Sequence, residues 1–176
     1  NTSASYGSSV TLRSNTFTRT GYTFNGWNTK ADGTGTSYSN RASVSNLSTT
    51  DGATIPLYAQ WKVNTYTIAY HANGGSGSMS NTSATYGANV TLRSNTFTRT
   101  GYTFNGWNTN SSGTGTSYSN EASVKNLTST NNGSVTLYAQ WKANSYTIVY
   151  HANGGSGSMS NTSASYGSSV TLRSNT

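Results

Sequence analysis

The side chains that could support catalysis are few, and they do not recur together. The sequence repeats in tandem without gaps, so each position can be compared with its copy one period later. None of the three acids has an acidic counterpart: Asp32 aligns with Ser112, Asp51 with Asn131 and Glu121 with Arg41. Paired-carboxylate chemistry and a Ser–His–acid triad both need an acid in a fixed place. We therefore expect that the chain is not an enzyme.

Side chains that could bind a metal or cofactor are equally few. Each repeat carries one histidine, His71 or His151, and the chain has no cysteine. A zinc site needs three or four protein ligands at suitable spacing. We therefore expect histidines at strand ends, with no metal and no cofactor.

The stretch "HANGGSGS" at residues 71–78 has the closely spaced glycines of a phosphate-binding loop. No Lys-Ser or Lys-Thr pair follows it, and no helix is predicted to open there, so the context of a phosphate loop fails. The glycines instead predict a flexible turn between two strands of a hairpin.

Aromatic side chains are the remaining candidates, because they can stack on sugars. The tryptophans recur in pairs, Trp27 with Trp107 and Trp61 with Trp141. A small unit with few Leu, Ile or Val needs large rings for its core, so we assign the tryptophans to the core. The better candidates for weak glycan contacts are tyrosines predicted to face outward: Tyr58, Tyr138, Tyr38 and Tyr118.

Composition limits the class of protein. Charged residues make up only 7% and aromatic residues 12% of 176 residues, which indicates folded units with uncharged polar surfaces. The formal net charge of +7 comes from scattered Lys and Arg rather than from a patch, so we expect no nucleic-acid binding. No apolar run reaches membrane-spanning length, so we expect no membrane insertion within this window. No signal peptide is visible, so signals for secretion or anchoring are expected to lie outside it.

The elements that position these side chains belong to a tandem repeat. Residues 1–96 and 81–176 are identical at 74 of 96 positions, without a gap. We expect a unit lacking its first strand at 1–63, a complete unit at 64–143, and the first two strands of a further unit at 144–176. We read the chain as a slice of a longer array. The alternative is that 144–176 completes residues 1–63 of a neighbouring molecule by strand donation. Residues 1–16 and 161–176 are identical and would then compete for one place, so the slice is preferred.

Within one unit the pattern predicts four or five strands and little helix. Residues 65–72 alternate as a half-buried strand, residues 85–92 follow as a second strand, and residues 134–141 form the last one. Asn105-Gly106 marks a bulge or turn between Phe104 and Trp107. Residues 121–127 form a short ordered segment of unspecified type. Only residues 142–144 separate one unit from the next, which favours a stiff, extended array.

Three motifs in fixed order resemble a known family. "YTIAYHANGGSGSM", "RTGYTFNGWNT" and "VTLYAQW" are similar to the Listeria–Bacteroides repeat, the B-repeat type of internalin B, and the resemblance covers every part of the chain. The resemblance implies a mostly β, α+β unit of the β-grasp (ubiquitin-like) class. It also implies a place in extracellular, multi-domain surface proteins, often as a tandem spacer, and no catalytic residues.

The function we expect is a structural spacer or stalk in an extracellular surface protein or adhesin. Its partners are then the neighbouring repeats of the same chain. Two alternatives stay open at this point. One is weak, multivalent binding of cell-wall or host glycans, strengthened by avidity. The other is a filament assembled by strand donation.

Overall fold

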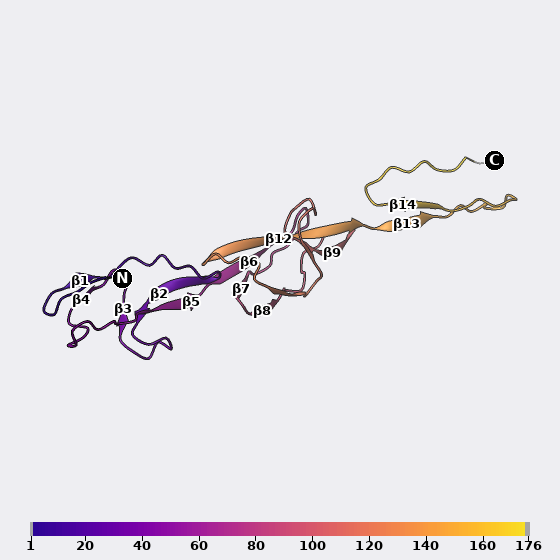
Figure 1. The fold of residues 1–176 in the computed structure, drawn as a ribbon. Coiled ribbons are helices and arrows are strands. Elements are labelled where there is room, and N and C mark those ends of the chain that lie inside the picture. The colour runs from indigo at the N-terminus through magenta and orange to yellow at the C-terminus, as the bar shows by residue number, and fades with distance from the viewer. Residues whose placement is uncertain (1, 175–176) are drawn as a thin grey trace. The chain divides into compact units, whose positions relative to one another are not determined.

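The computed structural model describes residues 2–174, and all of its regular elements are strands (Figure 1). The strands are β1 (Val10–Thr11), β2 (Tyr22–Asn28), β3 (Ser37–Tyr38), β4 (Ser43–Val44), β5 (Tyr58–Val63), β6 (Thr65–His71), β7 (Thr82–Thr85), β8 (Asn89–Thr91), β9 (Tyr102–Asn108), β10 (Ser117–Tyr118), β11 (Ser123–Lys125), β12 (Gly133–Ala143), β13 (Ser145–Ile148) and β14 (Thr162–Ser165). The prediction of a mostly β chain is confirmed. No helix among residues 2–174 has the length and apolar character to span a membrane.

The second repeat contains a five-stranded sheet in the order β10-β9-β12-β6-β7. Two hydrogen bonds fix the direction of β6 against β12. The Asn132 amide donates to the Thr65 carbonyl at 2.7 Å, and the Trp141 Nε1–H donates to the Ala72 carbonyl at 2.8 Å. Residue numbers therefore rise together along both strands. The first and last long strands of the repeat lie side by side and run parallel, whereas β9 pairs antiparallel with β12.

The core of the second repeat combines aromatic and aliphatic side chains. On β6, the alternating residues Tyr66, Ile68 and Tyr70 are buried, as the period-2 pattern predicts. Trp107 is fully buried and contacts Tyr70, Phe97 and Phe104, with ring centroids 4.9–6.1 Å apart. The assignment of Trp107 to the core is confirmed. Trp27, Trp61 and Trp141 are only partly buried.

A β-bulge interrupts β9 at the predicted Asn-Gly pair. Phe104 pairs with Trp141, but Trp107 pairs with Ala139, so two residues of β9 face one of β12. Gly106 has φ of +106°, and a Cβ there would lie 2.8 Å from the Tyr118 carbonyl oxygen. Only glycine adopts this conformation so close to another backbone, which is why the pair marks the bulge.

The other two segments repeat parts of this arrangement. In the first repeat, β3-β2-β5 matches β10-β9-β12, and β1-β4 matches the pair β8-β11. The shift of register also recurs, between Phe24 and Gly26. Near the C-terminus, β13 and β14 form an antiparallel pair that matches β6 and β7 in sequence.

One local prediction is wrong and another is incomplete. Residues 85–92 are not one strand: β7 ends at Thr85, a turn follows at Gly87, whose φ is +86°, and β8 begins at Asn89. The predicted turn at residues 73–78 is confirmed, since Asn73 and Gly74 form a turn between β6 and β7, which are neighbours in the sheet. Its packing against Thr98 and Trp141 was not predicted, and Ser76 forms an isolated bridge with Thr98. We call residues 72–77 the strap.

The chain divides into two compact units that do not follow the repeat boundaries. The first comprises residues 1–67, 83–89 and 125–134, and the second comprises residues 68–82, 90–124 and 135–176. The first unit thus includes the beginning of the second repeat, and the second unit includes the beginning of the third. Each unit therefore contains one connection between successive repeats.

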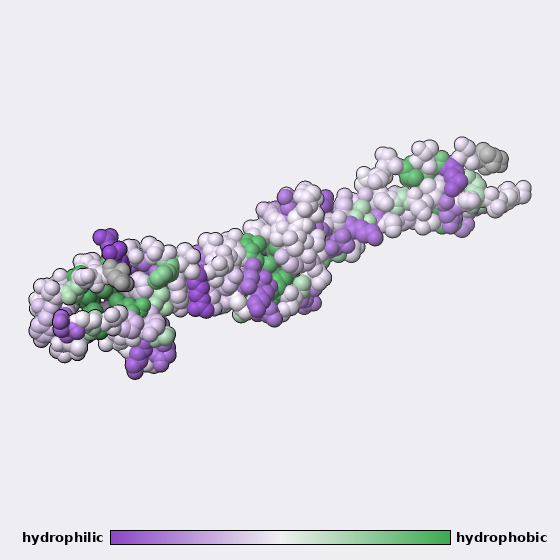
Figure 2. All heavy atoms as spheres, viewed as in Figure 1, coloured by the Kyte–Doolittle hydropathy of each residue, from purple (hydrophilic) through white to green (hydrophobic). Residues whose placement is uncertain are grey.

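The visible surface is weakly polar. In Figure 2, most residues are pale, apolar green is confined to small areas, and strongly hydrophilic residues are dispersed among them. This distribution agrees with the low content of charged residues.

Candidate functional site

A buried polar site lies where one repeat passes into the next. Asn64 is the single residue between β5 and β6. Its backbone amide donates to the Gly21 carbonyl, and its own carbonyl accepts from the Tyr86 amide, both at 2.9 Å. One residue thereby joins the turn before β2 in the first repeat to the turn after β7 in the second.

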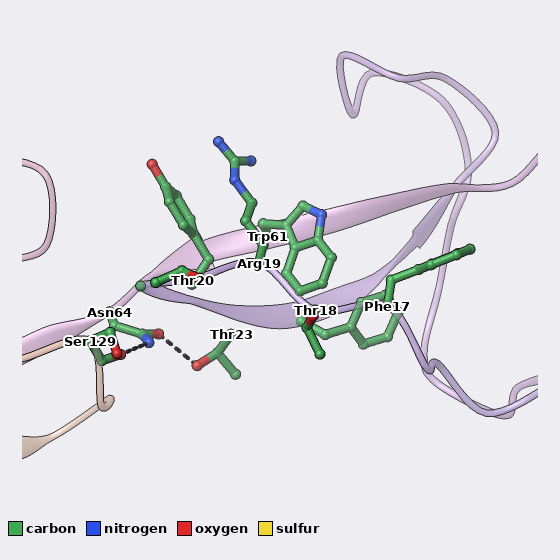
Figure 3. Close-up of a pocket in the computed structure, with 11 residues that line it drawn as sticks. Phe17, Thr18, Arg19, Thr20, Thr23, Trp61, Asn64 and Ser129 are labelled. Carbon is green, nitrogen blue, oxygen red and sulfur yellow. Dashed lines mark hydrogen bonds between the residues drawn. The ribbon is translucent and has the colours of Figure 1, made fainter.

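The Asn64 side chain adds two further hydrogen bonds (Figure 3). Its Oδ1 accepts from the Thr23 hydroxyl at 2.7 Å, and its Nδ2 donates to the Ser129 carbonyl at 2.7 Å. Asn64 is only 6% exposed. A buried amide needs such partners, because an unsatisfied polar group in a protein interior is costly. Asn64 is therefore held from both repeats.

At this connection the ring of Tyr86 packs against Gly21. Gly21 has φ of +77°, and a Cβ on it would overlap the Tyr86 ring. The position thus needs glycine both for its backbone conformation and for space. Tyr86 also packs edge-on against Tyr22, with centroids 6.4 Å apart. The Arg19 guanidinium lies 3.9 Å from the centroid of the Tyr22 ring, within cation–π range.

The backbone contacts and the threonine hydrogen bond recur at the next connection between repeats, although Asn144 is exposed where Asn64 is buried. The Asn144 amide donates to the Gly101 carbonyl, the Tyr166 amide donates to the Asn144 carbonyl, and the Thr103 hydroxyl donates to Asn144 Oδ1 at 2.7 Å. Gly101 again has φ of +77° and no room for a Cβ beneath Tyr166. We call these two sets the junction clasps: Gly21, Thr23, Asn64 and Tyr86 form the first, and Gly101, Thr103, Asn144 and Tyr166 the second. All residues of each clasp lie within one compact unit.

A groove of about 430 Å³ adjoins the first clasp. Its walls include Phe17, Thr18, Arg19 and Trp61, and Figure 3 draws these side chains together with the Asn64 hydrogen bonds. The matching residues of the second repeat, Phe97, Thr98, Arg99 and Trp141, are the ones that the strap contacts.

No group of three or more His, Cys, Asp or Glu side chains suited to a metal ion occurs among residues 2–174. Asp32 is exposed, and its carboxylate accepts hydrogen bonds from within its own loop. The Thr34 amide and hydroxyl donate to its carboxylate at 3.0 and 2.8 Å, and these bonds, the amide first, lower the pKa of Asp32 below its ordinary value.

The four candidate glycan tyrosines occupy different surroundings. Tyr58 is 42% exposed, and the other three are half-buried. Tyr138 packs against the His71 ring with centroids 5.2 Å apart. Tyr38 and Tyr118 lie on the short strands opposite Trp27 and Trp107. Of the four, Tyr138 is the one paired with a histidine ring at the surface.

Sequence reasoning missed the clasp residues. Asparagine is common throughout the chain, so Asn64 and Asn144 carry no compositional signal. The available signal was position, because each is the single residue between two successive strands, β5 and β6 or β12 and β13. The partner positions are distant in the sequence, and their meeting depends on the fold.

Comparison with known proteins shows that the internal repeat also occurs in a family of other proteins. The model of the Listeria-Bacteroides repeat domain matches residues 1–60, 66–140 and 146–176. A protein of Evansella cellulosilytica, provisionally designated a Gly-rich membrane protein, is 36% identical over 156 residues, which are 87% of this chain and 18% of the relative. A second protein of that organism, provisionally designated a membrane protein, is 37% identical over 120 residues, 66% of this chain and 16% of the relative. The chain thus spans less than a fifth of either relative. No solved structure matches it.

Proposed function

This chain belongs to the Listeria-Bacteroides repeat domain family, and on that basis we propose that it is a structural spacer of an extracellular surface protein. In this role the repeats form a stalk that holds a distal domain, such as an adhesin head, away from the cell envelope. The proposal assigns the repeats no catalysis, cofactor, nucleic acid or membrane insertion. The membrane designation of the two relatives supports a place at the cell surface.

The observation that carries the proposal is the recurrence of the junction clasp. A free linker between domains leaves their orientation open. Here one residue, Asn64 or Asn144, replaces a linker and is hydrogen-bonded on both sides. Tyr86 and Tyr166 fill the space above a glycine that accepts no side chain. Such a connection resists bending, which is the property that a stalk needs.

The strand arrangement supports a β-grasp unit and a mechanical role. β6 and β12 lie adjacent and parallel, and they lead into and out of the second repeat. Tension applied through the chain would load this ladder in shear, so that many hydrogen bonds must break together. Extending one repeat of about 80 residues at ~3.4 Å each releases about 270 Å of chain. Forced unfolding is expected to give steps of that size rather than a smooth extension.

The experiment that tests the stalk measures the stiffness of the first junction. Because the chain has no cysteine, spin labels can be placed at two exposed, equivalent positions with Ser45→Cys and Lys125→Cys. Pulsed electron resonance is expected to show one narrow distance distribution. The same labels in a chain carrying Asn64→Ala and Tyr86→Ala should give a broader one. An equally broad distribution in the unmodified junction would contradict the proposal.

Glycan binding is the second candidate, and one observation favours it. The half-buried Tyr138 ring packs against the exposed His71 ring, and Asn73 beside His71 donates Nδ2 to the Ser111 carbonyl at 2.8 Å. Aromatic faces next to hydrogen-bonding groups suit sugars. Binding to a glycan panel and to purified cell walls, at low and physiological salt, separates the candidates. Saturable, salt-resistant binding that is lost in Tyr138→Ala would favour a lectin-like repeat over a pure spacer.

A further inference from the structure

We propose that one corner of the second repeat, formed by His71, Asn73, Tyr138 and the loop tip at residues 110–112, binds uncharged glycans. This site deepens the glycan-binding candidate above, on which it rests, by adding the class of sugar and the residues that set specificity. Every residue of the corner belongs to the complete second repeat and to one compact unit. The site therefore depends on no other part of the chain.

Two aromatic rings form the apolar part of the corner. His71 ends β6, and Tyr138 lies on β12, the neighbouring strand of the sheet. Tyr138 is half-buried and His71 is exposed, and their ring centroids lie 5.2 Å apart with the ring planes at 53°. The tyrosine ring is thus anchored by burial and supports a histidine ring that faces solvent. Two rings in contact offer an apolar platform against which the C–H face of a sugar can pack.

One hydrogen bond determines which nitrogen of His71 can donate. The Asn73 backbone amide donates to His71 Nδ1 at 3.0 Å. A ring nitrogen that accepts a hydrogen bond carries no proton, so in the neutral ring the proton is on Nε2. The histidine therefore offers a single N–H donor from a ring whose orientation is fixed. A donor of this kind suits one hydroxyl of a sugar, because a few precisely placed polar groups give a binding site its specificity.

Asn73 also holds the loop beside the two rings. Its Nδ2 donates to the Ser111 carbonyl at 2.8 Å and to the Ala139 carbonyl at 2.9 Å. Both amide hydrogens are therefore used, and Oδ1 is left as an acceptor. The Gln140 Nε2 also donates to the loop, at the Asn110 carbonyl, over 3.4 Å. Because these bonds hold backbone carbonyls, the loop tip is in place before a ligand arrives, which lowers the entropic cost of binding.

The side chains of the loop tip supply further polar groups without a formal charge. Asn110 and Ser111 are exposed. Asn110 Oδ1 accepts from the Ser112 amide at 2.9 Å and from the Ser112 hydroxyl at 2.8 Å, so the Asn110 Nδ2 group is left to donate. The Ser111 hydroxyl can donate or accept. Sugar hydroxyls thus meet both donors and acceptors at the corner, whereas an anionic polymer would need a cation for a strong, charge-assisted bond.

Within the surrounding sequence, the two repeats differ only at this tip. Residues 90–120 align with residues 10–40, and the sole differences are "NSS" at 110–112 against "KAD" at 30–32. The two loops are nevertheless held alike, because Asn28 and Asn108 each donate Nδ2 to two glycine carbonyls of their loops at 3.1–3.2 Å. Exposed loop side chains on a rigid scaffold are a common location of binding residues. We therefore assign the selection among glycans to residues 110–112.

Exchange of the loop tip between repeats tests the site without a new backbone. The triple variant Asn110→Lys/Ser111→Ala/Ser112→Asp gives the second repeat the tip of the first and leaves the net charge unchanged, since it adds one Lys and one Asp. Calorimetric titration of the full chain uses three soluble uncharged polymers (a glucan, a mannan and an oligomer of N-acetylglucosamine), with a polyuronate as the anionic comparison. The unmodified chain is expected to bind an uncharged polymer, and the triple variant to bind it at least about tenfold more weakly.

NMR spectra recorded during the same titration locate the bound polymer. Signals of the His71 ring and of the Ser111 amide are expected to shift, whereas the indole signal of the fully buried Trp107 should stay in place and report an intact core. Tyr138→Ala should weaken binding at least about tenfold. Tyr58→Ala, at the copy of Tyr138 in the first repeat, is the matched control and should bind like the unmodified chain.

The possible outcomes separate this site from the glycan-binding candidate itself. Binding of an uncharged polymer that is unchanged in the triple variant, or that shifts signals elsewhere, would overturn the corner while leaving a glycan-binding repeat. Binding of the polyuronate alone would overturn the uncharged class of ligand. No binding of any polymer would remove both the corner and the glycan-binding candidate, and would leave the spacer role untouched.

Discussion

The ring of Tyr86 lies directly over the α-carbon of Gly21, so that a residue of the second repeat covers a glycine of the first. Tyr166 covers Gly101 in the same way. Each glycine also has a left-handed backbone conformation, with φ of +77°. The contact therefore depends on two properties of one residue, its backbone freedom and its missing side chain, and these can be separated by mutation.

Gly21→Ala is expected to destabilise the first compact unit by two additive effects. Alanine in the left-handed region costs about 1–2 kcal/mol, and displacement of the Tyr86 ring costs about 1–3 kcal/mol more. Gly7→Ala is the matched control, since Gly7 has φ of +82° but no atom within 4 Å of its Cβ position. Urea unfolding measures both. Equal losses for the two variants would show that the ring contact contributes nothing.

Asn64→Ala should loosen the first clasp locally. Removal of the amide leaves the Thr23 hydroxyl and the Ser129 carbonyl without this partner, at a cost of about 1–3 kcal/mol. Hydrogen exchange at the Tyr86 amide, which donates to Asn64, should accelerate accordingly. Asn25→Ala alters an exposed asparagine of the same unit and should leave that exchange rate unchanged.

Gly75→Ala should destabilise the second compact unit by about 1–3 kcal/mol, because the added methyl group meets the Trp141 ring and a backbone carbonyl. Gly155→Ala is the control offered by the repeat itself. Its sequence surroundings are identical, but a Cβ there meets only Ala152, so a change within about 0.5 kcal/mol is expected. Urea unfolding of the two variants provides the comparison. Tolerance of both substitutions would mean that the strap is not packed.

Asn108→Asp should disorder the loop between β9 and β10. The fully buried Asn108 amide donates to the carbonyls of Gly113 and Gly115 and to the Ser117 hydroxyl. A carboxylate there would have no N–H group to donate, and one of its oxygens would face carbonyl oxygens. The free energy of unfolding should therefore fall by about 2–4 kcal/mol at neutral pH. Burial raises the pKa of such a carboxyl, so part of the loss should be recovered in mildly acidic solution. Asn105→Asp, at an exposed position, should show no such pH dependence.

The pKa of Asp32 is lowered by the Thr34 amide and then by the Thr34 hydroxyl. Stability from these bonds is present above the pKa of the unfolded chain and is lost as pH falls through the lower folded value. Thr34→Val removes the hydroxyl bond alone and should move the Asp32 pKa part of the way toward 3.8. Carbon-detected NMR titration of the carboxyl measures this. An unchanged midpoint would assign the whole shift to the backbone amide.

The strands that local pattern determines were predictable. The alternation at residues 65–72 became β6, the apolar pattern at 134–141 lies within β12, and the Asn-Gly pair became a bulge. These features depend on nearest neighbours and on the period of two along a strand. Membership in the repeat family followed from three motifs in fixed order.

The features that local pattern could not supply are long-range contacts. The turn at Gly87 was hidden because apolar residues flank it on both sides, and pattern alone joined them into one strand. The turn at residues 73–78 was predicted, but its packing against Thr98 and Trp141 was not, because those residues are distant in sequence. The role of Asn64 could not be predicted, because its partners Thr23 and Ser129 are distant in sequence and meet it only in the folded chain. The role of the four candidate tyrosines stays a prediction.

The clasp also bears on how the gene can change. Every residue of a clasp recurs in the sequence at the same offset, one period further along. Unequal recombination that adds or removes one period anywhere therefore regenerates the same glycine, threonine, asparagine and tyrosine at the new connection. No interface has to be invented or lost. The number of repeats, and with it the reach of the protein, is thus a quantity that a lineage can adjust in single steps without altering how any repeat folds.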